Sequence, residues 1–271
     1  MAEKEEVTLG SVQETLLLPL WGRAVETQTN NPLLKDETAV TITKSISYNF
    51  ETIAKNVNKL SMKSWIARSI FFDGIIKNFI AEYPEAVIVN IGCGLDTTFD
   101  RIDNGKVRWF DLDFPEVIEL RQKYIKQSER RRFIAKSALD FSWFNDVPAK
   151  QNTLFMVAGV LYYFTNQEVK NLFLALQKNF GKSEIIFDYS SPKGVEIANK
   201  KVITSAGMGS SSFLTWGIEN IKEIENWNKG IKVIKSIPMF HEFKKNFPLY
   251  KRIGMNISDM LKIMSLAHVM L

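Results

Sequence analysis

The hydrophobic pattern at the start of the chain is helical. In residues 62–82 the apolar side chains recur at intervals of three and four, which is the spacing of one helical face. Residues 15–26 and 36–46 show similar spacing, and Asp36 is placed to cap the second of these helices. Pro84 ends the third helix. We therefore predict a helical N-terminal cap over residues 1–85.

The pattern changes at residue 86. Residues 86–91 form a short, almost entirely apolar and β-branched run, which is typical of a strand buried on both faces. Similar runs alternate with helical patterns as far as residue 190. This alternation predicts an α/β fold with right-handed βαβ units and a doubly wound, Rossmann-like parallel sheet. The further strands are predicted at residues 107–112, 132–135, 153–158 and 184–189, and the helices between them at 115–124 and 167–180.

The last third of the chain is less regular. Residues 231–237 predict a strand, and the apolar spacing in residues 256–269 predicts a C-terminal amphipathic helix. The Gly- and Ser-rich residues 207–212 predict a loop. We interpret residues 1–271 as a single domain. Its core at 86–190 follows the N-terminal cap, and residues 191–271 supply a lid insertion and complete the sheet.

Composition and charge exclude several classes of protein. Hydrophobic residues make up 45% and charged residues 24%, which is ordinary for a globular protein. The formal charge of +5 is too small for this length to indicate a nucleic-acid partner. The single cysteine, Cys93, excludes an internal disulfide and a multi-Cys metal site. With only two histidines in the chain, we expect no metal.

Neither a signal peptide nor a membrane span is apparent. The charged N-terminus lacks an apolar core, and no stretch approaches the roughly 20 apolar residues that span a bilayer. We expect a cytoplasmic protein with no membrane partner. The sequence indicates no particular oligomeric state.

The candidate chemistry begins where the first core strand ends, at Gly92-Cys93-Gly94. Ligands of doubly wound sheets bind beyond the carboxyl ends of the strands, and glycine lets the backbone approach them closely. The next strand ends in Asp111-Leu112-Asp113. Asp113 follows Gly92 by about 20 residues, the spacing of an acid that binds both hydroxyls of a ribose. Either acid could instead cap the helix that begins near residue 115, so both stay open as ribose ligands.

Position 97 separates two classes of cofactor. A dinucleotide loop needs a third glycine there, so that the helix can start close beneath a pyrophosphate, but this chain has Thr97. S-adenosylmethionine has no phosphate and needs no such cradle, so the sequence favours it. The alternatives are a nicotinamide-dependent dehydrogenase and a protein that binds a cofactor on the same fold without catalysis.

Residues 90–99 and 109–118 resemble the leucine carboxyl methyltransferase family, which includes polyketide O-methyltransferases of the tetracenomycin type. Three further segments agree in order: Arg68 followed by Asp73, residues 137–143, and residues 158–164, which are similar to the family's E-G-V-L-x-Y-L segment. The resemblance covers about residues 15–190. It implies a methyltransferase that uses S-adenosylmethionine, with O-methylation of a carboxylate or hydroxyl on a small molecule.

The resemblance also implies roles for individual residues. Arg68 would pair with the cofactor's carboxylate, a task that suits a bidentate guanidinium. Asp113 would hold the ribose, and Tyr163 would lie near the acceptor. The chain departs from the family at Ala158, where a glutamate is frequent. The expected cofactor contacts are Arg68, Gly92, Cys93, Gly94, Asp111, Asp113, Ala138, Leu139, Ala158 and Gly159.

The acceptor side is less defined by the sequence. We find no general base to assign, and the catalytic residues stay unassigned. The resemblance implies that N-terminal helices roof the pocket, so Arg23 is a hypothetical contact for an anionic acceptor. His241 is the second hypothesis, because it is the histidine in a late loop.

Overall fold

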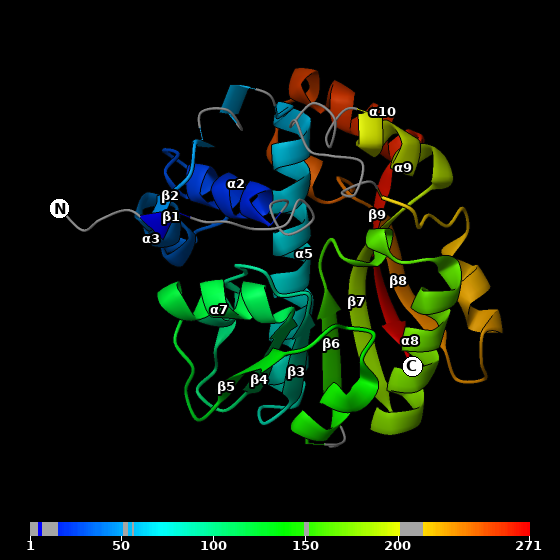
Figure 1. Ribbon diagram of the computed structural model, residues 1–271. Coiled ribbons are helices and arrows are strands. Elements are labelled where there is room, and N and C mark those ends of the chain that lie inside the picture. The colour runs from blue at the N-terminus through cyan, green and yellow to red at the C-terminus, as the bar shows by residue number, and fades with distance from the viewer. Residues whose placement is uncertain (1–4, 7–15, 51–53, 56, 149–151, 201–213) are drawn as a thin grey trace.

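The centre of the molecule is a seven-stranded sheet (Figure 1). The computed structural model describes residues 5–6, 16–50, 54–55, 57–148, 152–200 and 214–271. The strands lie in the order β5-β4-β3-β6-β7-β9-β8; the first five are parallel, and β9 is antiparallel to both neighbours. The predicted doubly wound α/β sheet is confirmed. The strands are β3 (Val87–Ile91), β4 (Arg108–Asp113), β5 (Arg131–Ala135), β6 (Thr153–Val157), β7 (Ser183–Ser190), β8 (Lys232–Pro238) and β9 (Met264–Met270).

The strand order contains one reversal. The chain runs outward from β3 to β4 and β5, and then returns to the other side of β3 with β6. Helices therefore leave β3 and β6 in opposite directions, and a crevice opens between the carboxyl ends of these two strands.

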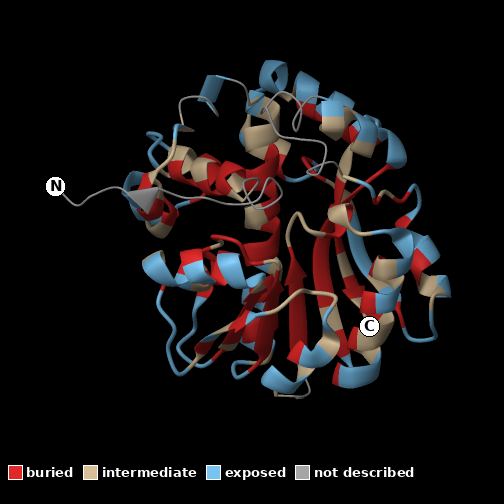
Figure 2. Ribbon diagram, viewed as in Figure 1, coloured by how far each residue is buried: buried red, intermediate tan, exposed pale blue. Residues whose placement is uncertain are grey.

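Helices cover both faces of the sheet. Val87, Val89 and Ile91 of β3 belong to the apolar cluster that includes α8 (Asn166–Phe180), whereas Ile88 packs with α5 (Lys59–Glu82). Successive side chains of a strand point to opposite faces, so a strand between two helical layers needs apolar residues at every position. Figure 2 shows this as continuous burial along the central strands.

The remaining helices flank this core. α2 packs on the N-terminal half of α5, α3 packs on α2, and the three helices form a third apolar cluster, which includes Trp65. A short parallel pair, β1 (Glu5–Glu6) and β2 (Ile46–Ser47), lies beside them. The described α-helices other than α5 and α8 are α2 (Leu17–Thr27), α3 (Glu37–Ser45), α6 (Thr98–Ile102), α7 (Pro115–Tyr124), α9 (Pro192–Ala198) and α10 (Ile253–Met260). The short 3-10 helices are η1 (Phe141–Asp146), η2 (Leu161–Tyr163), η5 (Ile221–Asn226), η6 (Phe243–Asn246) and η7 (Leu249–Arg252).

A buried charged network fastens the N-terminal helices to the sheet. Asp36 Oδ2 accepts hydrogen bonds from Arg23 Nε at 2.8 Å, Arg101 Nη1 at 2.8 Å and Thr97 Oγ1 at 2.5 Å. Its Oδ1 caps α3 by accepting from Ala39 N at 2.9 Å. Burial raises the pKa of Asp36, but the two guanidinium groups outweigh burial and lower that pKa overall. Thr97 therefore serves as a structural donor at the position where a dinucleotide loop would need glycine.

The C-terminal helix predicted over residues 256–269 is wrong. α10 ends at Met260, Lys262 adopts a left-handed φ of 48°, and Met264–Met270 forms β9 between β7 and β8. The apolar run suits either structure, but two neighbouring strands offer hydrogen bonds along both edges. The predicted strand at 231–237 corresponds to β8. The predicted loop at 207–212 lies outside the described residues, and the division of the chain at residues 85 and 190 stays a prediction.

Asp36→Asn should destabilise the protein by about 3 kcal/mol or more, because it leaves the buried Arg23 without its countercharge and leaves Arg101 with Asp73 alone. Urea unfolding followed by circular dichroism measures this. Asp146→Asn is the matched control, since Asp146 pairs with Lys136 at the surface and should contribute less than about 1 kcal/mol. Equal losses in the two variants would contradict the structural role of Asp36.

The same carboxylate predicts a pH dependence. Its pKa is lower in the folded chain than the ordinary 3.8, so its stabilising contribution is complete above the unfolded pKa and is lost as pH falls through the folded pKa. The free energy of unfolding of the unmodified chain should therefore fall below about pH 4, and it should fall less steeply in Asp36→Asn. Parallel curves would show that Asp36 does not contribute.

Candidate functional site

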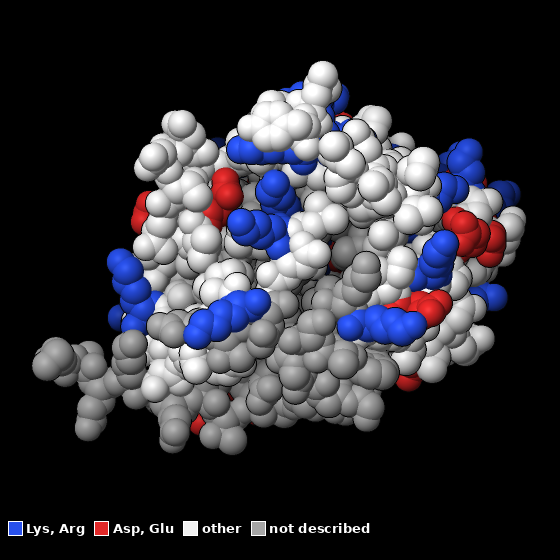
Figure 3. Space-filling view, turned by 90° about the horizontal axis from the view of Figure 1, so that it is seen from above, with Lys and Arg blue, Asp and Glu red and all other residues white. Residues whose placement is uncertain are grey.

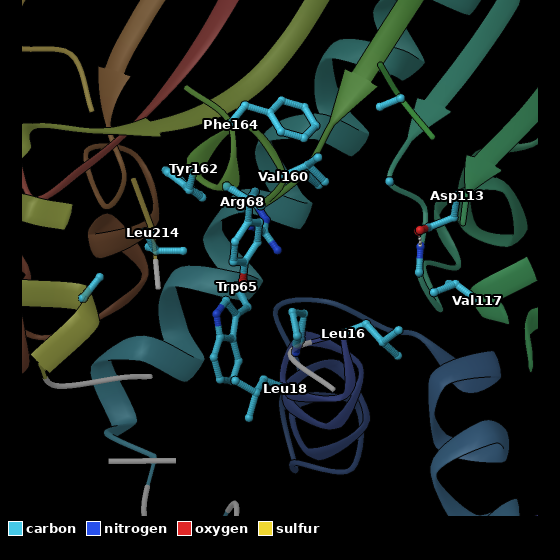
Figure 4. A pocket seen from close by; sticks show the side chains of 18 of the residues that line it. Leu16, Leu18, Trp65, Arg68, Asp113, Val117, Val160, Tyr162, Phe164 and Leu214 are labelled. Carbon is cyan, nitrogen blue, oxygen red and sulfur yellow. Dashed lines mark hydrogen bonds between the residues drawn. The ribbon is translucent and has the colours of Figure 1, made fainter. Parts of the chain in front are cut away.

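A cavity of about 490 Å³ lies at the carboxyl ends of β3, β4 and β6, at the reversal of strand order. Gly92 and Gly94 line it from the turn after β3, and Asp113 lines it from the end of β4. Arg68 enters from α5 on a different wall (Figure 4). The structure thus brings together residues that the sequence placed on three separate segments.

The turn after β3 requires glycine. Gly92 has a φ of +67° and Gly94 a φ of +46°, both in the left-handed region. A Cβ on Gly92 would lie 2.3 Å from Val160 Cγ2, and one on Gly94 would lie 3.2 Å from Leu16 Cβ. The amide of Gly92 donates to the Leu112 carbonyl at 2.8 Å, which fixes the turn against β4. The bare backbone can therefore form part of the cavity wall.

The structure distinguishes the two acids of β4. Asp111 is fully buried, and its oxygens accept hydrogen bonds from Asn90, Trp109, Arg121 and Arg131 at 2.8–3.2 Å. With every acceptor position used, Asp111 has none left for a ligand. The prediction of Asp111 as a cofactor contact does not fit this geometry, because its carboxylate lies two residues before the end of β4, where Arg121 and Arg131 bind it.

Asp113 lies at the end of β4, half-buried in the cavity wall. Its oxygens accept from the amides of Gly94 at 2.7 Å and Phe114 at 2.8 Å. Each carboxylate oxygen has a second lone pair, so the side chain can still accept from two ligand hydroxyls. Burial raises the pKa of Asp113, while the two amide bonds act to lower it.

A buried ion pair holds Arg68 in the cavity. Its Nη1 donates to Asp188 Oδ2 at 2.6 Å, and Asp188 Oδ1 accepts from the amide of Gly159 at 2.7 Å. Burial opposes the charge on Arg68, but the Asp188 carboxylate outweighs burial and raises the Arg68 pKa. Among the described residues only Asp188 accepts a hydrogen bond from Arg68, so Nε and Nη2 stay available to a ligand.

Gly159 makes this arrangement possible. Its φ is +75°, and a Cβ there would lie 2.7 Å from Arg68 Nη1. The adjacent Tyr162 is buried beside the pair, where burial first and the Asp188 charge second raise the pKa of its hydroxyl well above its usual value. Tyr162 therefore stays protonated and does not act as a base at neutral pH.

The other predicted residues divide between the cavity and the protein interior or surface. Ala138, Ala158, Gly159 and Tyr163 line the cavity along with the residues above. Cys93, which was predicted to contact the cofactor, is buried outside the lining, where it packs in the interior and burial raises the pKa of its thiol. Leu139 is half-buried next to the cavity without lining it.

The two hypothetical acceptor contacts lie elsewhere. Arg23 is buried away from the lining, where Asp36 accepts from its Nε and the Leu95 carbonyl accepts from its Nη2 at 3.1 Å. His241 is exposed beyond β8 and also lies outside the lining. Arg23 has a structural role because its charge is neutralised within the N-terminal helices.

Sequence reasoning missed two side chains of this site. Trp65 lines the cavity one helical turn before Arg68, but its apolar spacing resembles that of any core residue. Asp188 lies inside the strand that the sequence predicts at residues 184–189, and no functional role was predicted for it. A carboxylate in the buried part of an apolar strand is a detectable signal, because such a charge needs a partner.

The residues of the cavity fit S-adenosylmethionine. Asp113 offers acceptors for a ribose, Arg68 offers donors for an amino-acid carboxylate, and the side-chain-free turn at Gly92 leaves room between them. Within the described residues, no group of three or more His, Cys, Asp or Glu side chains is arranged to hold a metal ion.

Comparisons with known proteins agree with this fit. A model of the leucine carboxyl methyltransferase family matches residues 17–177. The tetracenomycin polyketide synthesis O-methyltransferase TcmP of Streptomyces glaucescens is 28% identical over 229 residues, covering 84% of this chain and 83% of that protein. The S-adenosyl-L-methionine-dependent methyltransferase dpfgK of Gibberella zeae is 26% identical over 264 residues, covering 90% and 87%.

Solved structures share the fold at low sequence identity. A DUF574 family protein from Streptomyces avermitilis superimposes with a TM-score of 0.59 at 11% identity, covering 96% of this chain and 99% of that one. The plantazolicin methyltransferase BpumL, solved with S-adenosylhomocysteine, gives a TM-score of 0.52 at 13% identity, covering 96% and 99%. The sheet is that of Rossmann-like methyltransferases.

Gly92→Ala should lower the melting temperature more than Gly105→Ala does. Both glycines have positive φ, but a Cβ at Gly105 meets nothing within 4 Å, whereas one at Gly92 collides with Val160. Backbone strain of about 1–3 kcal/mol applies to both, and the collision adds to it only at Gly92. Thermal unfolding compares the two variants, and equal shifts would show that the turn can relax away from Val160.

Proposed function

The chain belongs to the leucine carboxyl methyltransferase family, and we propose that it transfers a methyl group to an oxygen atom of a small molecule. It is a methyltransferase that uses S-adenosylmethionine. The comparisons give no support to the dehydrogenase alternative. Because the sulfonium supplies an already activated methyl group, the chain's own residues mainly align the acceptor and exclude water.

We assign the cofactor contacts from the geometry of the cavity. Asp113 accepts from the ribose hydroxyls, and Arg68, held by Asp188, donates to the amino-acid carboxylate. The turn from Gly92 to Gly94 lies along the methionine portion, and Ala138 lies beside the adenine. This assignment is supported by the position of Asp113 and Arg68, which line the same cavity from different sides (Figure 4).

The apolar acceptor side carries the proposal for the substrate. Trp65, Tyr163, Phe164 and Leu214 line the cavity near Arg68, and the described lining contains neither histidine nor lysine. At Ala158, where the resemblance leads one to expect glutamate, the wall is uncharged. A carboxylate acceptor is ionised at neutral pH and needs no base, and an acidic hydroxyl needs little help. This wall therefore favours a small, largely apolar acceptor with such an oxygen.

Titration calorimetry tests the cofactor assignment. Asp113→Ala should weaken S-adenosylhomocysteine binding by about 1–3 kcal/mol, because the ribose hydroxyls lose a buried acceptor. Asp146→Ala, at an exposed site, is the control and should bind normally. Unchanged affinity in Asp113→Ala would mean that another group binds the ribose. Binding of NAD with no binding of S-adenosylhomocysteine would contradict the cofactor itself.

Transfer of a labelled methyl group to a panel of small acids, phenols and amines tests the acceptor. We expect products from the acids or phenols. A methyl ester is released by mild alkali and a methyl ether is not, so alkaline treatment identifies the methylated oxygen. Transfer to the amines alone would contradict oxygen methylation.

A further inference from the structure

A cluster of exposed apolar side chains lies on η7 and α10. Of the nine large apolar side chains that are exposed in the described part of the chain, six fall between residues 249 and 261. Soluble proteins scatter such residues, so this concentration marks an interaction surface. The six, which we call the α10 face, are Leu249, Tyr250, Ile253, Ile257, Met260 and Leu261.

The helix turns its apolar side outward. Ile253, Ile257 and Met260 follow helical spacing on the exposed side of α10, whereas Met255 and the acidic Asp259 are buried beneath it. The six side chains expose 37–79% of their surface. α10 itself lies at the upper edge of the molecule (Figure 1). Side chains this exposed project from the surface, so they suit a soft, deformable partner better than a rigid groove.

Positive charge surrounds the α10 face. Lys251 and Lys262 lie within or beside it, and Lys59 and Lys63 lie at the adjacent start of α5; no described acid forms a salt bridge with any of these four. Burial lowers the pKa of Lys63, the charges of Lys251 and Lys59 lower it further, and Glu26 acts in the opposite direction. Viewed from above, Lys and Arg side chains flank an uncharged surface (Figure 3).

Asp259, the acidic residue of this segment, does not neutralise the charges of these lysines. Asp259 Oδ2 accepts from Lys244 Nζ at 2.8 Å, and its Oδ1 accepts from the amide of Phe240 at 3.0 Å. Its carboxylate is thus neutralised inside the protein. The surface of residues 247–263 therefore exposes apolar side chains and cations, and none of its described residues is an exposed acid.

We propose that the α10 face docks on an anionic phospholipid bilayer. Apolar side chains on such a surface enter the boundary between headgroups and acyl chains, and lysines bind the lipid phosphates. A second copy of the chain fits less well, because a two-fold contact would bring the same lysines face to face. None of the described helices is long and apolar enough to cross a membrane, and surface docking requires none.

Docking would bring the cavity close to the bilayer. α5 carries Ser61 and Ser64 in the cavity lining and Lys59 and Lys63 beside the α10 face. Met264, which follows α10 by a short turn, also lines the cavity. The expectation of no membrane partner rested on the absence of a spanning segment from the sequence. The proposed peripheral contact departs from that expectation and needs no spanning segment.

Co-sedimentation of the full chain with vesicles tests the proposal. We expect binding to vesicles of phosphatidylcholine mixed with phosphatidylserine, weak binding to phosphatidylcholine alone, and weakening by salt. Ile257→Glu should reduce partitioning roughly tenfold or more, because it places a charge where an apolar side chain enters the lipid. Lys251→Glu should reduce binding to the mixed vesicles selectively.

The chain offers a matched control. Ile234 on β8 exposes 50% of its surface and Ile257 exposes 49%, so Ile234→Glu introduces the same charge at an equally exposed site outside the α10 face. It should bind vesicles normally, and unchanged melting temperatures establish that both variants fold. Equal loss in the two variants, or no vesicle binding by the unmodified chain, would overturn the proposal. A dimer or an acidic protein partner that depends on Ile257 without vesicle binding would also overturn it.

Discussion

The buried ion pair between Arg68 and Asp188 is the interaction on which the cavity depends. It joins α5 to β7, and through the Gly159 amide it also fixes the chain after β6. Removing one partner from such a pair typically costs about 3–5 kcal/mol, because the other charge stays buried. The guanidinium is therefore oriented before any ligand arrives, and little is lost in ordering it on binding.

The opposite wall follows from the end of β4. Asp111 and Asp113 point to the same side of the strand, but only Asp113 lies at its last position, next to the Gly92–Gly94 turn. Asp111, two residues earlier, is surrounded by Arg121 and Arg131 and stabilises the sheet. Two identical side chains thus have different roles, because one lies inside the sheet and the other at its edge.

Local patterns predicted the parts of the molecule that local physics determines. The five parallel strands, the glycine turn and the place of Asp113 follow from burial, backbone conformation and topology, whereas the role of Arg68 was predicted only from the family resemblance. The role of Arg23 could not be predicted, because its partner Asp36 belongs to another helix. The sequence shows two charged residues but not that they form an ion pair. The apolar residues of β9 suit both a helix and a strand, and only the place between β7 and β8 decides for the strand.

The central claim is that this family member holds S-adenosylmethionine between Asp113 and Arg68 at the reversal of strand order. A crystal structure of the complex with S-adenosylhomocysteine tests it most directly. The account predicts ribose hydroxyls within hydrogen-bond distance of Asp113 and the amino-acid carboxylate paired with Arg68, with the Arg68–Asp188 bond retained. A ligand that lies outside this cavity, or that turns its carboxylate away from Arg68, would contradict the account.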